Sequence, residues 1–179
     1  MLARSSTIRH KISGVALQTP LLIPSFSSKG FARSKKDDKS EIGKILAAAG
    51  EFLTEAYLIS AYDIHYGHIP NPLDLPFTPE LIFLDSGGYE ISTDRDYSSV
   101  IDPLPAPNDW NLQSWKSIIS SWPREIPLVV VNYDHHKERL PFMDQVSIAR
   151  RGFRKCEHLH LFLIKPETPD QTLLSNLTK

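Results

Sequence analysis

Residues 81–90 read LIFLDSGGYE: four apolar residues lead directly into an acid, a hydroxyl, two glycines, an aromatic residue and a second acid. A short apolar run bounded by turn residues is typical of a strand that is buried on both faces of its sheet. Such strands belong to parallel sheets, in which functional groups gather where the strands end at their carboxyl side. The stretch therefore predicts a buried strand at 80–84 and a functional edge that begins at Asp85.

Similar segments lie on both sides of this strand. Apolar runs such as LVVV at 128–131 indicate strands, and apolar residues at helical spacing indicate amphipathic helices between them. Ser40 and Asp109 are the expected N-caps of two helices, and Gly50 is an expected C-terminal stop. We expect strands at 15–24 (interrupted by Pro20), 56–64, 80–84, 127–133 and 158–165, and helices at 41–49, 110–122, 140–154 and from about residue 169 onward.

Strands that alternate with helices predict an α/β fold of parallel βα repeats. Residues 1–179 are expected to form a single domain. Open doubly wound sheets and barrels both fit the pattern. A complete (β/α)₈ barrel needs roughly 250 residues, so a chain of 179 residues is too short for a whole barrel.

Composition excludes several classes of protein. The formal net charge is −1, so any contact with a nucleic acid would need a local basic patch. The single cysteine, Cys156, excludes an internal disulfide and a multi-cysteine zinc site within this chain, and we expect a reducing, cytoplasmic setting. No run of eighteen apolar residues occurs, so we expect no membrane span.

Polar residues follow three of the predicted strands. The segments are AYDIH at 61–65, DSGGY at 85–89 and NYDHH at 132–136. Because the carboxyl ends of parallel strands meet at one edge of a sheet, Asp85 and Asp134 are expected to lie at the same edge although they are far apart in sequence.

The DSGGY segment has the chemistry of a pocket for a nucleobase. A carboxylate such as Asp85 accepts hydrogen bonds from ring N–H groups or transfers a proton. Gly87 and Gly88 allow a ligand to approach the backbone closely, and Tyr89 offers a ring for stacking, worth about 1–3 kcal/mol. The same residues also suit an ordinary turn.

The histidines raise the possibility of a metal site. His135 and His136 are neighbours, so on a strand they would point to opposite sides, whereas His158 and His160 would share one face without a visible third ligand. No phosphate-binding loop or dinucleotide fingerprint occurs, which argues against the standard nucleotide cofactors. An unrelated metal-dependent or hydrolase-like α/β enzyme remains an alternative, with Asp63, His65, Asp134 and His135 as its functional side chains.

The order of these segments resembles the tRNA-guanine transglycosylase family, whose members are (β/α)₈ barrels that exchange a guanine in nucleic acid for a 7-deazaguanine. Residues 85–89 match the family signature Asp-Ser-Gly-Gly-(Phe/Tyr), and the segment TPLLIPS at 19–25 resembles an early barrel strand. Residues 132–134 stand where the family has a strand that ends in a base-recognising Asp. The segment at 61–65 is only loosely similar to the family's Asn-Thr-Tyr-His-Leu.

The resemblance implies a role for each matching residue. Asp85 would contact the base and assist proton transfer as the catalytic residue, and Asp134 would read the donor edge of the ring. The ligand would be guanine or a 7-deazaguanine base, and the polynucleotide tRNA or, as in divergent relatives, DNA. The remaining substrate-binding residues would be Ser86, Gly87, Gly88, Tyr89 and His65.

This chain departs from the family pattern in several places. Glu90 stands where the family has Gln, and the family's nucleophilic aspartate and cysteine-rich zinc site belong to a C-terminal half that residues 1–179 do not include. The resemblance thus covers the N-terminal half of a barrel, and we expect no cofactor in this chain. Because a half-barrel has open sheet edges, a non-catalytic module completed by a partner chain or by a second copy in a homo-oligomer is the alternative function.

Overall fold

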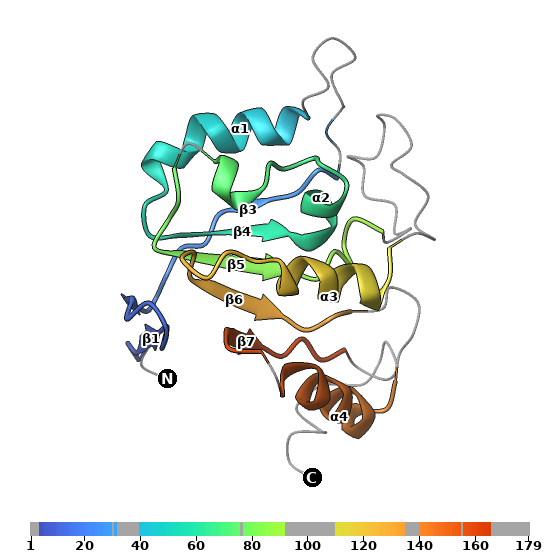
Figure 1. The fold of residues 1–179 in the computed structure, drawn as a ribbon. Coiled ribbons are helices and arrows are strands. Elements are labelled where there is room, and N and C mark those ends of the chain that lie inside the picture. The colour runs from blue at the N-terminus through green and yellow to red at the C-terminus, as the bar shows by residue number, and fades with distance from the viewer. Residues whose placement is uncertain are drawn as a thin grey trace.

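A five-stranded parallel sheet forms the centre of the computed structural model, which describes residues 4–29, 31, 40–75, 77–91, 110–134, 140–154 and 156–165 (Figure 1). The strand order is β3-β4-β5-β6-β7, so each strand pairs with the next one along the chain. This confirms the predicted α/β fold with a parallel sheet. The strands are β3 (Ser25–Phe26), β4 (Ala56–Ser60), β5 (Leu81–Asp85), β6 (Leu128–Val131) and β7 (Leu159–Leu161).

Helices pack against one face of this sheet. Successive strand residues point to opposite faces, and alternate residues of β4, β5 and β6 join α-helical residues such as Leu46 and Trp115 in one buried cluster. The strand residues of this cluster are Phe26, Tyr57, Ile59, Ile82, Leu84, Leu128 and Val130. The helices are α1 (Glu41–Ala49), α2 (Ala61–His65), α3 (Leu112–Ser120) and α4 (Phe142–Phe153), with short 3₁₀ helices η1 (Gly50–Phe52) and η2 (Pro72–Asp74).

The opposite face carries an N-terminal hairpin of β1 (Thr7–Arg9) and β2 (Ala16–Gln18), which pair antiparallel. Leu17 of β2 is buried in a second cluster with Ala56, Leu81, Phe83 and Val129 of the sheet. In Figure 1 the hairpin lies at the end of the sheet opposite to the arrowheads. The hairpin therefore covers the amino end of the sheet, away from the carboxyl ends of the strands.

Local capping explains where two helices begin. Ser40 is the N-cap of α1, as predicted: its hydroxyl accepts a hydrogen bond from the amide of Gly43 at 3.1 Å. The N-cap of α3 is Asn111, whose Oδ1 accepts from the amides of Gln113 and Ser114 at 2.9 and 3.1 Å. The prediction of Asp109 as the cap was therefore wrong, because the helix begins two residues later than expected. Asp109 itself and the helix expected from residue 169 lie outside the described residues.

Three predicted strands were wrong in their extent, and the strand predicted at 158–165 is limited to β7 at Leu159–Leu161. Residues 15–24 do not form one strand: β2 ends at Gln18, and β3 begins only at Ser25. Pro20 and Pro24 lie between them, and proline has no backbone N–H to donate to a strand ladder. The strand predicted at 56–64 ends at Ser60, and residues 61–65 form the short helix α2.

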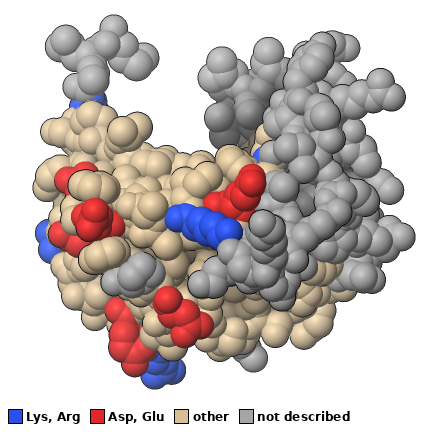
Figure 2. Space-filling model, turned by 90° about the horizontal axis from the view of Figure 1, so that it is seen from above, with Lys and Arg blue, Asp and Glu red and all other residues tan. Residues whose placement is uncertain are grey.

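Both signs of charge occur on the face of the molecule at the top of Figure 1. Figure 2 shows the molecule from above, where acidic and basic side chains of the described residues lie scattered among uncharged ones. Within the described ranges, no helix is long and apolar enough to cross a bilayer.

Candidate functional site

The candidate site lies at the carboxyl ends of β5 and β6. Asp85 is the last residue of β5 and stands in register with Ser60 of β4. Asp134 follows the end of β6 by three residues. Gly88, three residues after Asp85, lies against Asp134: a Cβ added to Gly88 would lie only 2.8 Å from the carboxylate Oδ2 of Asp134. The structure therefore brings Asp85, the turn after it and Asp134 to one edge of the sheet.

The turn is held in place by two aromatic residues. Gly87 has φ of +85°, and an added Cβ would lie 2.6 Å from Cβ of Tyr62 and 2.9 Å from Nε1 of Trp110. The Trp110 indole donates to the carbonyl of Ser86 at 3.0 Å, and the Gly87 amide donates to Oδ2 of Asp85 at 3.2 Å. Only a residue without a side chain fits this position, so the turn has a single well-defined path.

Ser86 is almost completely buried, with 1% of its surface exposed. Its hydroxyl has no hydrogen-bond partner among the described residues. A buried polar group without a partner costs free energy, so the Ser86 hydroxyl has hydrogen-bonding capacity that the described residues leave unused.

Tyr89 lies at the surface, with 48% of the residue exposed. Lys29, from the loop after β3, is buried next to it. Its Nζ donates to the backbone carbonyl of Tyr89 at 3.0 Å and lies 4.1 Å from the centre of the phenol ring. A cation over the ring fixes the position of an aromatic side chain that solvent and ligands can reach.

A lysine neutralises the second acid. Lys165, which follows β7, places Nζ 2.6 Å from Oδ2 of Asp134. Burial raises the pKa of Asp85, the Asp134 charge raises it further, and Lys165 together with the Gly87 and Ser86 amides opposes the rise. The net effect is a raised pKa for Asp85, which favours its use as a proton acceptor that can return the proton.

Two more acids are buried close to this edge. Asp63 of α2 accepts hydrogen bonds from the amide of Ser28 at 2.9 Å and from the Ser28 hydroxyl. Burial, followed by the charge of Glu90, raises the pKa of Asp63 to about 7. Glu90 accepts from the hydroxyls of Ser27 and Ser60 at 2.6 and 3.0 Å, and burial raises its pKa as well, with a further rise from Asp85.

The loop after β3 also contributes to the site, and its residues are not among those predicted from the sequence. Ser27, Ser28 and Lys29 follow the carboxyl end of that strand and contact Glu90, Asp63 and Tyr89. The signal was present, because polar residues after a strand were the criterion that selected Asp85. It was overlooked because the strand was placed at 15–24 rather than at Ser25–Phe26.

The ring contacts of His65 in the described part of the chain are with Trp110 and Tyr66, not with Asp85 or Asp134. It is exposed at the end of α2, where its ring centre lies 5.3 Å from that of Trp110 and 4.8 Å from that of Tyr66. The structure thus places His65 beside the residue that supports the turn.

The described residues that the metal hypothesis requires do not come together to form a metal site. The described parts of the chain contain no group of three or more His, Cys, Asp or Glu side chains placed to hold an ion. His160 stacks on Phe153 at 3.9 Å between ring centres, and His158 stacks on His10 at 6.4 Å. His135 and His136 lie outside the described residues.

Comparison with known proteins returned no match: no family model, no curated protein and no solved structure is similar to this chain.

Proposed function

We propose that the chain is a tRNA-guanine transglycosylase-like protein whose site at the carboxyl ends of β5 and β6 holds guanine or a 7-deazaguanine base. One observation carries the proposal: Gly88 packs against the carboxylate of Asp134. This contact unites the DSGGY turn with a second acid from the next strand, and an acid on each side of a glycine turn can recognise the polar edges of a purine.

Each residue has a chemical task in this proposal. Asp85, with its raised pKa, accepts a ring proton and returns it. The unpartnered hydroxyl of Ser86 bonds to the base, and the exposed ring of Tyr89 stacks on it. Asp134 accepts hydrogen bonds from the donor edge of the ring while Lys165 balances its charge.

The proposal includes a barrel. Five parallel strands that pair in chain order, with helices on one face, match consecutive βα units of a (β/α)₈ barrel. A doubly wound sheet reverses its strand order at a switch point, and the order of the described strands has no such reversal. Base exchange in tRNA or DNA would also require the family's attacking aspartate, which the resemblance places outside residues 1–179.

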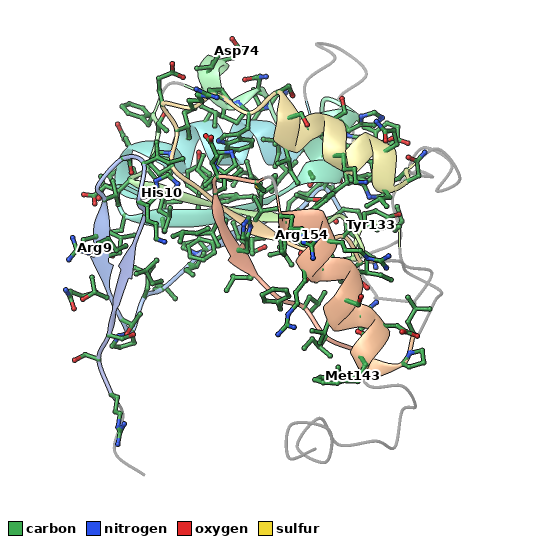
Figure 3. The ribbon with its side chains drawn as sticks, turned by 60° about the horizontal axis from the view of Figure 1, so that its bottom comes forward. Arg9, His10, Asp74, Tyr133, Met143 and Arg154 are labelled. Carbon is green, nitrogen blue, oxygen red and sulfur yellow. The ribbon has the colours of Figure 1, made fainter. Side chains whose placement is uncertain are left out.

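Purine binding tests the proposal in the chain as it stands. In a calorimetric titration with 7-deazaguanine, Asp85→Ala and Asp134→Ala should each weaken binding by about tenfold to a hundredfold, because a hydrogen bond to a charged group contributes about 1.5–3 kcal/mol. Asp74→Ala is the matched control, since this exposed acid lies on η2 (Figure 3). Unchanged affinity in both site variants, or an equal loss in the control, would refute the pocket.

A specific observation favours the second candidate function, a module that pairs with another chain. β3 and β7 are the outer strands of the sheet as described. Leu161, Phe162 and Leu163, at the end of β7 and after it, are 46%, 50% and 41% exposed. Apolar residues at the outer strand of a sheet favour pairing with a partner chain or a second copy.

A further inference from the structure

A cavity of about 650 Å³ lies between α3 and α4. Its walls come from these two helices, from the segments that follow them and from Ile12 in the turn of the hairpin. Neither Asp85 nor Asp134 lines it. Its volume falls within the range of about 300–1,000 Å³ that is typical of small-molecule sites. We call this space the α3–α4 cavity.

Positive charge dominates the lining of the α3–α4 cavity. Lys116 and Arg124 contribute from the side of α3, and Arg151 and Arg154 from the end of α4; among the described lining residues, Glu157 is the single acid. Figure 3 labels Arg154 at the C-terminal end of α4. Within the described ranges none of these four cations has an ion pair. Several unpaired cations around one cavity favour an anionic ligand.

A buried donor without a partner also lines this cavity. Trp115 is 3% exposed, and its indole Nε1 has no hydrogen-bond partner among the described residues. An indole N–H can only donate, and a buried donor left unpaired costs about 1–3 kcal/mol. Nδ1 of His158, also in the lining, is buried and unpartnered too. Both side chains therefore have hydrogen-bonding capacity that the described residues leave unused.

Apolar side chains form much of the remaining wall. Ile12, Ile119, Trp122 and Phe153 face the same space, and a neighbouring cavity of about 380 Å³ shares Trp115, Lys116, Arg151, Gly152 and Phe153 in its lining. A ligand that fits both parts of this lining has a charged head and an apolar or aromatic body.

We propose that the α3–α4 cavity binds a small organic phosphate of about the size of a mononucleotide. A phosphate dianion matches a cluster of cations better than a single carboxylate does, and the planar forks of Arg151, Arg154 and Arg124 suit its oxygens. Arginines in the last turn of a helix also stabilise its dipole. That role does not account for Lys116 and Arg124, or for the unpaired indole of Trp115.

Titration with adenosine 5′-monophosphate, followed by tryptophan fluorescence and calorimetry, tests this proposal. We expect saturable binding that is about tenfold tighter than that of adenosine or inorganic phosphate alone, because head and body both contribute. Arg151→Gln and Arg154→Gln should each weaken binding by about tenfold, the effect of losing one charge-assisted hydrogen bond. Arg150→Gln is the matched control, since Arg150 is on the same helix but does not line the cavity.

Two further variants separate this site from packing effects and from the proposed base site. Trp115→Phe keeps an aromatic ring but removes the donor, so it should weaken binding of the nucleotide without lowering the melting temperature by more than a few degrees. Asp85→Ala should leave the nucleotide affinity unchanged, whatever it does to purine binding. No saturable binding, or an equal loss in Arg150→Gln and Arg151→Gln, would overturn the proposal.

Discussion

At the scale of single residues, Glu90 is the residue whose role in the structure differs most from the role that the sequence indicates. In the motif it appears only as an acid in place of the family's glutamine. In the structure it is buried and accepts hydrogen bonds from Ser27 and Ser60, so it connects the loop after β3 to β4. Sequence reasoning could not find this role, because it depends on two hydroxyl groups brought together by strand pairing.

The buried acids make stability depend on pH. The pKa of Asp63 is raised to about 7 and that of Glu90 is raised as well, first by burial. Between the ordinary and the raised pKa the folded state binds more protons than the unfolded state, so the contribution of these groups to stability falls as pH rises through this window. Glu90→Gln removes one of the charges. The difference in free energy of unfolding, Glu90→Gln minus wild type, should therefore increase by about 1–2 kcal/mol as the pH rises from 5 to 8.

Urea unfolding at the two pH values measures this difference. Glu125→Gln is the control, because Glu125 is exposed in the turn before β6, and its effect should not change with pH. A Glu90→Gln difference that stays constant from pH 5 to pH 8 would show that the Asp63–Glu90 interaction does not govern stability in this range.

At the scale of elements, the turn after β5 is the most constrained part of the site. Gly87→Ala introduces a Cβ at a positive φ, 2.6 Å from Cβ of Tyr62. We expect it to lower the free energy of unfolding by about 2 kcal/mol or more. Gly152→Ala on α4, where an added Cβ meets nothing within 4 Å, should instead raise it by about 0.5–1 kcal/mol. Chemical denaturation of both variants is the measurement, and a Gly87→Ala protein as stable as the wild type would mean that the turn can take another path.

Periodicity and capping predicted most of the elements, because their physical causes are local. The continuous apolar run at 128–131 gives β6, and Ser40 caps α1. One of the two main failures has a local cause and the other a non-local cause. At 15–24, Pro20 and Pro24 separate β2 from β3. At 61–65, the chain forms the short helix α2, in which Tyr62 and Asp63 are buried.

At the scale of the whole molecule, the sequence predicted a parallel sheet but left open how its strands are ordered. The shared edge of Asp85 and Asp134 follows from parallel strands alone and could be predicted. The contacts of Lys29 with Tyr89 and of Lys165 with Asp134 could not, because they depend on which strands are neighbours. The observed order β3-β4-β5-β6-β7 supplies that information.

Open sheet edges lead to a prediction about assembly. If the apolar segment after β7 mediates pairing, size-exclusion chromatography with light scattering should detect a dimer or larger species, and Phe162→Glu should shift it to monomer. Phe52→Glu, at an exposed position on η1, should leave the mass unchanged. A wild-type monomer at all concentrations would remove self-pairing as a function, without affecting the proposal of a base site.

A crystal structure of the chain with 7-deazaguanine bound tests the central claim most directly. We predict that the ring stacks on Tyr89, and that Asp85 and Asp134 contact it from two sides beside Gly88. A base bound in the α3–α4 cavity or elsewhere, with Asp85 and Asp134 untouched, would contradict the account.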